Sequence, residues 1–162
     1  MEYQGGKENE ISCDVLLSTI PIRATYEILD PQPSREVMDA TGDLKYSSLL
    51  ILYVVVDVPR LLPANWIFFP EARYSFGRIS EQKGFSEKMI PADRTVLLVE
   101  IPLARQEISL LDRDLLVQKA LAELRESGVL RSEHSVLETF TSQCESVYQI
   151  YDLGFKKNLD IA

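Results

Sequence analysis

Aromatic rings and arginines gather in one stretch of the sequence, residues 65–80. This stretch contains the only tryptophan of the chain and two arginines interspersed among aromatic residues. A planar guanidinium can bind a carboxylate or a diphosphate through parallel hydrogen bonds, and a neighbouring ring can stack on the ligand. The stretch is therefore the first candidate for contact with a small molecule. The residues predicted to bind a substrate are Trp66, Tyr74, Phe76 and Arg78.

We expect this stretch to form two strand pieces, 66–69 and 74–79, separated at Pro70, because proline cannot donate a ladder hydrogen bond. Side chains alternate between the two faces of a strand, so Trp66 and Phe68 share a face. In the second piece the same period predicts a common face for Tyr74, Phe76 and Arg78. A simpler interpretation stays open for each residue, in which the rings belong to the sheet core and the arginine forms a surface ion pair.

Other patterns that carry chemistry are missing from the sequence. There is no Gly-x-Gly-x-x-Gly and no Walker loop, so the chain has no dinucleotide or P-loop fingerprint of its own. The only histidine, His134, stands in a polar loop where a solvated or capping role is favoured over a catalytic triad. One histidine and two distant cysteines do not give the ligand spacing of a zinc site. We predict no catalytic residue and no metal site, and the cofactor-binding residues stay undetermined.

The length, charge and cysteine content of the chain limit the kinds of protein it can be and the partners it can bind. A chain of 162 residues with 46% hydrophobic content suits one domain with a substantial core. The net charge of -8, with no basic run, argues against a nucleic acid partner. The longest apolar run, 49–56, is far shorter than the roughly 20 residues of a membrane helix. Two cysteines favour small buried thiols in a reducing compartment, so we expect a cytoplasmic protein without a membrane span.

The first part of the chain carries turn and helix signals. The pair Gly5-Gly6 predicts a hairpin within residues 1–21, whose second strand covers 11–17. Proline at position 21 can sit in the first turn of a helix, and we expect that helix to run to residue 29. Ser34 is a plausible N-cap for a short helix over 35–40.

The middle of the chain is rich in strand signals. The apolar density of 46–58 predicts a central strand that is covered on both faces, and 94–101 and 136–151 are further strands. Between them, Ser109 and Asp112 resemble a capping box before a helix that ends at Gly128. The predicted solvated side of this helix carries Arg113, Lys119, Glu123 and Glu126. The fold class expected is α+β, a mixed, largely antiparallel sheet with helices packed on one face.

The order of several short motifs resembles a known superfamily. Residues 13–22 read Cys-Asp-Val-Leu-Leu-Ser-Thr-Ile-Pro-Ile, a strand followed by Ser-Thr and a proline. Further pieces follow in order at 44–46, 66–71, 76–79, 85–86, 90–91, 98–100 and 147–152. This ordered set, which covers nearly all of the chain, resembles the flavin-containing amine oxidase superfamily. It is most similar to the branch of protoporphyrinogen oxidase-like, phytoene desaturase-like and UDP-galactopyranose mutase-like proteins.

The resemblance implies a part of an enzyme. Members bind FAD through an N-terminal Gly-x-Gly-x-x-Gly and a Gly-Arg segment near the C-terminus, and neither is present here. The resemblance therefore implies the substrate-binding domain of an FAD-dependent oxidoreductase, with FAD in the parent protein and none bound by this chain alone. Residues 1–21 would lead out of a missing flavin-binding part, and 22–162 would form the substrate domain. The expected partners are a small-molecule substrate and the missing FAD-binding domain of the same polypeptide.

In the family the sheet roofs the flavin ring, so the resemblance implies that residues 65–80 form one wall of the flavin site. One departure is Gln149, which stands where members usually carry a proline. Redox activity is not expected of this chain alone.

The alternative from a different functional class is a non-catalytic binding or assembly module that uses the same sheet surface.

Overall fold

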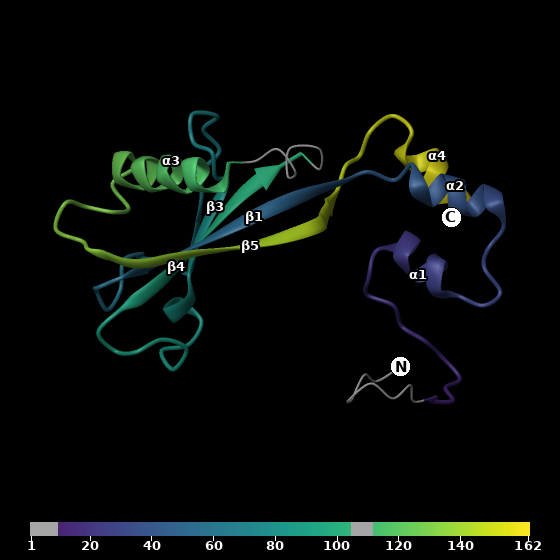
Figure 1. Cartoon of the computed structure of the whole chain (residues 1–162), viewed down its shortest axis with the longest axis horizontal. Helices are drawn as coiled ribbons and strands as arrows, with labels where there is room; N and C mark the ends of the chain where they lie inside the picture. Colours follow the sequence, from purple (N-terminus) through teal and green to yellow (C-terminus); the bar gives the residue numbers. More distant parts are fainter. Residues whose placement is uncertain (1–9, 105–111) are drawn as a thin grey trace. The chain divides into compact units, whose positions relative to one another are not determined.

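The chain forms two compact units, seen in a computed structural model that describes residues 10–104 and 112–162 (Figure 1). One unit comprises Met1–Leu44 and Leu153–Ala162, and the other comprises Lys45–Asp152. Within the described ranges, no helix is long and apolar enough to cross a membrane.

In its described residues, the first unit contains three short helices, α1 (Ile22–Ile28), α2 (Arg35–Gly42) and α4 (Phe155–Ile161). The predictions of a helix start at Pro21 and of Ser34 as a cap are confirmed, since the Ser34 hydroxyl accepts a hydrogen bond from Val37 N at 3.4 Å. Helix α4 was not predicted. The Tyr26 hydroxyl donates to Ala162 O at 2.6 Å and links α1 to the end of α4.

The predicted strand over 11–17 is not formed. Its supposed hairpin partner and turn lie outside the described residues, and 10–20 carry no helix or strand. A strand needs a neighbour to satisfy its backbone groups, and no described segment supplies one. The aliphatic side chains of this segment are consequently exposed, with Val15 77% and Leu17 89% accessible to solvent.

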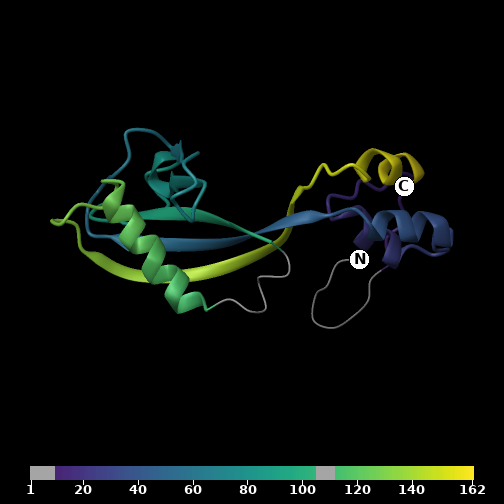
Figure 2. The same cartoon turned by 90° about the horizontal axis from the view of Figure 1, so that it is seen from above.

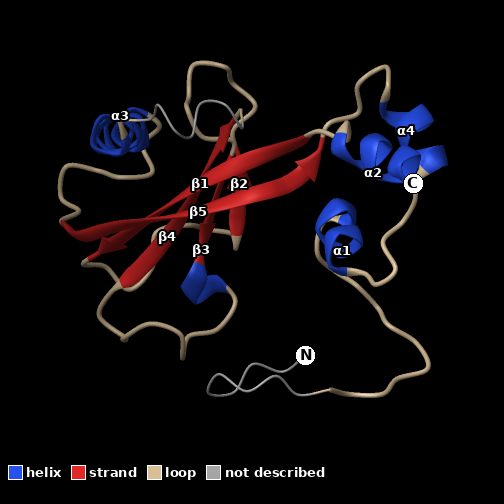
Figure 3. Ribbon diagram, turned by 45° about the vertical axis from the view of Figure 1, so that its right-hand side comes forward, coloured by secondary structure: helices blue, strands red, loops and turns tan. Residues whose placement is uncertain are grey.

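The second unit contains a five-stranded sheet in which every pair of neighbouring strands is antiparallel (Figure 3). The strand order is β2-β3-β4-β1-β5. The predicted α+β class and largely antiparallel sheet are confirmed. The strands are β1 (Tyr46–Val56), β2 (Trp66–Phe68), β3 (Arg78–Glu81), β4 (Thr95–Leu103) and β5 (Val136–Gln149), with one 3-10 turn, η1 (Gln82–Gly84).

Helix α3 (Arg113–Glu126) lies across one face of this sheet (Figure 2). The Asp112 carboxylate caps it by accepting from Leu115 N at 3.0 Å, whereas Ser109 of the predicted capping box lies outside the described residues. Gly128 ends the helix with φ of 78°, a conformation that favours glycine.

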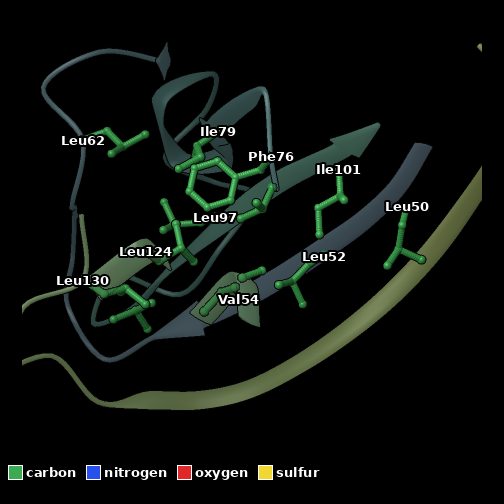
Figure 4. Packing of buried hydrophobic residues seen from close by; sticks show 13 residues of the cluster. Leu50, Leu52, Val54, Leu62, Phe76, Ile79, Leu97, Ile101, Leu124 and Leu130 are labelled. Carbon is green, nitrogen blue, oxygen red and sulfur yellow. The ribbon is translucent and has the colours of Figure 1, made fainter. Parts of the chain in front are cut away.

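The core fills the space between α3 and the sheet (Figure 4). Ala120 and Leu124 of the helix meet alternate side chains of the central strands. On β1 the core side chains are Leu50, Leu52, Val54 and Val56, and on β4 they are Leu97, Val99 and Ile101. On the other face of β1, Leu49 is buried but Ile51, Tyr53 and Val55 are only partly buried, so the prediction of cover on both faces is wrong for most of the strand within the described residues.

Glu123 is the second correction in this unit. It was predicted on the solvated side of the helix, but only 7% of it is exposed. Its carboxylate accepts from Ser75 N at 2.8 Å and from the Ser75 hydroxyl at 2.5 Å. The helix therefore contacts the 73–76 segment as well as the sheet, and two of its sides are covered.

A buried carboxylate fixes the middle of the connection between β1 and β2. Glu81 is fully buried and accepts hydrogen bonds from Leu61 N and Leu62 N, both at 2.8 Å, and from the Thr95 hydroxyl at 2.7 Å. Arg60 adds an ion pair with an N–O distance of 3.9 Å. A carboxylate without water is stable only when it is bonded in this way.

Replacing Glu81 with alanine should lower the free energy of unfolding by about 3 kcal/mol or more, because two backbone N–H groups and the Thr95 hydroxyl lose their buried acceptor. Urea unfolding followed by circular dichroism measures the change. The matched control is Glu71→Ala, at an exposed position, which should change stability by less than about 0.5 kcal/mol. A loss of similar size in both variants would contradict the anchoring role of Glu81.

Candidate functional site

The sheet face opposite α3, here called the outer face, carries two of the four predicted residues, Trp66 and Arg78. Strand register places directly opposed side chains on the same face. One transverse row runs across all five strands as Phe68, Arg78, Glu100, Ile51 and Ser142. The next row runs as Trp66, Ser80, Leu98, Tyr53 and Phe140.

The outer face is aromatic and open to solvent. Phe68 is 64% exposed and Trp66 is 49% exposed. Trp66 stacks on Phe85, with ring centroids 5.8 Å apart, and Tyr53 stacks on Phe140 at 4.5 Å. Rings held in pairs keep a fixed orientation while their free sides stay accessible, which suits them to stack on a planar ligand.

Arg78 and Glu100 form a cross-strand ion pair in the first row. The Arg78 Nε donates to Glu100 Oε1 at 2.7 Å, and Arg78 Nη2 donates to the same oxygen. This hydrogen bonding to Glu100 raises the pKa of Arg78 above its ordinary value, although partial burial opposes the shift, so the guanidinium stays charged. Because an arginine has five N–H donors, the pair with Glu100 leaves donors for a ligand.

Arg78 borders a small, mostly apolar hollow on the outer face, with a volume of ≈ 270 Å³. The guanidinium carbon lies 5.8 Å from the centroid of the Phe68 ring. The other lining residues are Leu49, Gly77, Glu100, Pro102 and Tyr148. A charged fork between rings, next to apolar surface, can orient an anionic group while a ring packs beside it.

The structure separates the four predicted substrate-binding residues. Trp66 and Arg78 lie on the outer face in adjacent rows. Phe76 is only 2% exposed and lies in the core, where it stacks with Tyr74 at a centroid distance of 5.4 Å. The predicted common face of Tyr74, Phe76 and Arg78 is therefore wrong.

The reason is that β3 begins only at Arg78, so the two-residue alternation does not extend back to position 74. Phe69 N donates to Gly77 O at 2.9 Å, and Gly77 N donates to Glu100 O at 3.0 Å. Before Gly77 the chain turns towards α3, where Ser75 is held by Glu123. Phe76 consequently points into the core rather than along the outer face.

Two residues of the hollow were missed in the sequence, Glu100 and Tyr148. Their position beside Arg78 follows from strand register, which the sequence does not state. One signal was available for Glu100, because it is the only charged residue in the apolar run 95–101. A charge in such a strand needs a partner on a neighbouring strand. In the described part of the chain, no group of three or more His, Cys, Asp or Glu side chains could hold a metal ion.

No family model and no curated protein matches the sequence, but several solved structures match the fold. The structure of reduced UDP-galactopyranose mutase matches 94% of this chain with a TM-score of 0.75 and 20% identity. A protein assigned provisionally as a protoporphyrinogen oxidase, from Exiguobacterium sp. 255-15, matches 88% of this chain with a TM-score of 0.62 and 17% identity. An oxidoreductase from Methanosarcina mazei matches 74%, with a TM-score of 0.56 and 17% identity.

The chain spans about a third of the length of these proteins, namely 33% of the mutase, 31% of the Exiguobacterium protein and 28% of the Methanosarcina protein. At such low identity the comparison shows a shared fold. The chain therefore has the fold of one part of larger proteins that include a mutase and an oxidoreductase.

The Arg78–Glu100 pair should contribute little to stability, because it is partly open to solvent and screened by water. A double-mutant cycle with Arg78→Ala and Glu100→Ala should give a coupling of about 0.5–1 kcal/mol in the free energy of unfolding. The exposed Lys156–Asp160 pair is a control cycle, for which we expect less than about 0.5 kcal/mol. A coupling above about 3 kcal/mol would assign the pair a structural role instead.

Proposed function

We propose that this chain is the substrate-binding part of an FAD-dependent oxidoreductase, or of a mutase of similar build, and that its outer face forms one wall of the flavin site. The order of motifs along the chain supports this proposal. It is also supported by the fold shared with longer proteins, a mutase and an oxidoreductase among them. In this proposal residues 1–21 lead out of the flavin-binding part, and residues 22–162 form the substrate domain.

The observation that carries the proposal is the uncovered outer face of the central strands. Ile51 and Tyr53 of β1 are half-buried, while their neighbours Leu50 and Leu52 on the core side are fully buried. Burying apolar surface is worth roughly 25 cal/mol per Å², so an aromatic sheet face is costly to leave in water. A flavin-binding part that faced this surface across a narrow gap would remove most of it from solvent and leave room for a substrate.

The outer-face residues would then have different roles in binding the substrate. Arg78, held in place by Glu100, would bind an anionic group of the substrate such as a carboxylate or a diphosphate. Trp66, paired with Phe85, would offer a ring for stacking. Tyr74 and Phe76 would act from the core, where they support the turn into β3 without touching the substrate.

The exposed aliphatic residues before α1 support the same assignment. Val15, Leu16 and Leu17 are consecutive, so they would point to both faces of a strand, as in a strand buried inside a sheet. We propose that residues 11–17 pair with the flavin-binding part. The sequence has no Gly-x-Gly-x-x-Gly of its own, so the chain fits the role of a wall and not that of the nucleotide-binding site.

The purified chain should be colourless and should bind no FAD, because it lacks the glycine-rich turn that approaches the pyrophosphate. Absorbance titration with FAD measures this, and the visible spectrum should remain that of the free flavin. The longer parent protein, purified in the same way, is the positive control and should be yellow. A yellow, stoichiometric complex of the short chain would contradict the proposal.

In the longer parent protein, Arg78→Ala should weaken substrate binding by roughly tenfold or more, since a charge-assisted contact is lost, while the melting temperature changes little. Binding is measured by calorimetry and stability by thermal unfolding. The matched control is Arg73→Ala, which removes an exposed arginine that pairs with Glu126 of α3 and not with the outer face. If Arg78→Ala lowers the melting temperature and leaves affinity unchanged, Arg78 is a structural residue.

A further inference from the structure

A second cleft, distinct from the outer face, lies where α3 ends. Its volume is ≈ 390 Å³, and it opens between the loop that carries Arg60 and the loop that carries Arg131 and His134. Ile67 of β2 contributes to its wall. Because Ile67 alternates along β2 with Trp66 and Phe68, the cleft lies on the opposite side of β2 from the Arg78 hollow.

The cleft combines the only histidine of the chain with two arginines. The chain as a whole has 25 acidic and 17 basic residues, yet none of the described residues that line this cleft is acidic. The described lining of the cleft therefore contains no carboxylate beside its three potential hydrogen-bond donors, Arg60, Arg131 and His134. This arrangement favours a ligand with acceptor oxygens over a cation.

The geometry defines which nitrogen of His134 can donate. Arg131 N donates to His134 Nδ1 at 3.1 Å. A ring nitrogen that accepts carries no proton, so the proton of the imidazole must be on Nε2. His134 therefore bonds the backbone of its own loop through Nδ1, and Nε2–H is the donor that the ring can offer to a ligand.

Arg60 is oriented by the buried anchor of its own loop. Its Nε donates to Leu62 O at 3.1 Å, and Leu62 N is in turn held by Glu81. The Nε of Arg60 lies 3.9 Å from Glu81 Oε2, too far for a hydrogen bond. The two terminal Nη groups make no hydrogen bond to any described residue, so they are positioned donors without an acceptor.

The negatively charged groups near the cleft would repel a bound anion only weakly. Arg131 Nη1 lies 3.8 Å from Glu133 Oε1, but both side chains are well exposed, and such a pair is weak. The carbonyls of Glu123, Leu124 and Arg125 in the last turn of α3 already accept from Ser127, Leu130 and Gly128. Bonding within the chain therefore moderates the negative end of the helix dipole.

We propose that this cleft binds a small molecule through a phosphate monoester group. A tetrahedral phosphate presents several acceptor oxygens in different directions, which matches donors from Arg60, Arg131 and His134 better than a planar carboxylate does. The apolar side chains of Leu61, Pro63 and Val129 line the same cleft and would pack against the body of the ligand. This proposal does not depend on the function proposed for the outer face.

The single histidine allows a direct test by proton NMR of the full chain at constant pH and ionic strength. Titration with phenyl phosphate should shift the His134 ring resonances and the Arg131 amide saturably, with a Kd on the order of 1 mM or tighter. Inorganic phosphate should bind about tenfold more weakly, because it lacks the apolar body. Benzoate should also bind more weakly than phenyl phosphate. Equal affinity of phenyl phosphate and benzoate would overturn the assignment of a phosphate site.

Variants separate the cleft from general charge effects. Arg131→Gln should weaken phenyl phosphate binding at least about tenfold, and so should Arg60→Gln. Arg131 is 70% exposed, so its replacement should leave the fold intact, which the dispersion of the amide spectrum checks. Arg73→Gln is the matched control outside the cleft and should leave the affinity unchanged. No saturable shift in the natural chain, or the same affinity in Arg131→Gln, would overturn the proposal.

Discussion

The central strand β1 is apolar on both faces, whereas α3 covers only one of them. The core follows from the covered face, where Leu50, Leu52 and Val54 meet Ala120 and Leu124 without access to water. The other face leaves aromatic and aliphatic side chains half-exposed, which is unfavourable in water. The flavin-binding part proposed above would cover this face, and the fold itself occurs as about a third of larger proteins.

Burial gives different roles to two carboxylates on neighbouring strands. Glu81 of β3 points to the core side, where three hydrogen bonds compensate for its lost hydration. Glu100 of β4 points to the outer face and holds Arg78 while both remain in contact with water. The short strand β3 therefore carries two functions on its two faces. Glu81 holds the 61–62 loop on the core side, and Arg78 presents an oriented guanidinium on the outer face. The four residues of this strand connect the stability of the sheet to the surface proposed to bind a substrate.

Local patterns predicted the elements that depend on local physics. The apolar run of β1, the cap at Ser34 and the glycine that ends α3 each have a cause within a few residues of sequence. The positions of Phe76 and Glu123 could not be obtained in this way, because Ser75 links the two segments through a contact 48 residues apart. The pairing of Arg78 with Glu100 likewise requires the register of β3 on β4. The residue types predicted a binding surface. Which residues share that surface could be determined only from the register of the strands.

The two candidate sites share one support. Glu81 bonds the backbone of Leu61 and Leu62, and this loop orients Arg60 at the cleft. The same residue ends the strand that starts with Arg78, so it also fixes that strand between β2 and β4. Because the shared element is a fully bonded carboxylate in a dry core, its loss would leave several buried donors without an acceptor. The two candidate sites therefore depend on the same buried interaction, and a substitution of Glu81 would disturb both of them.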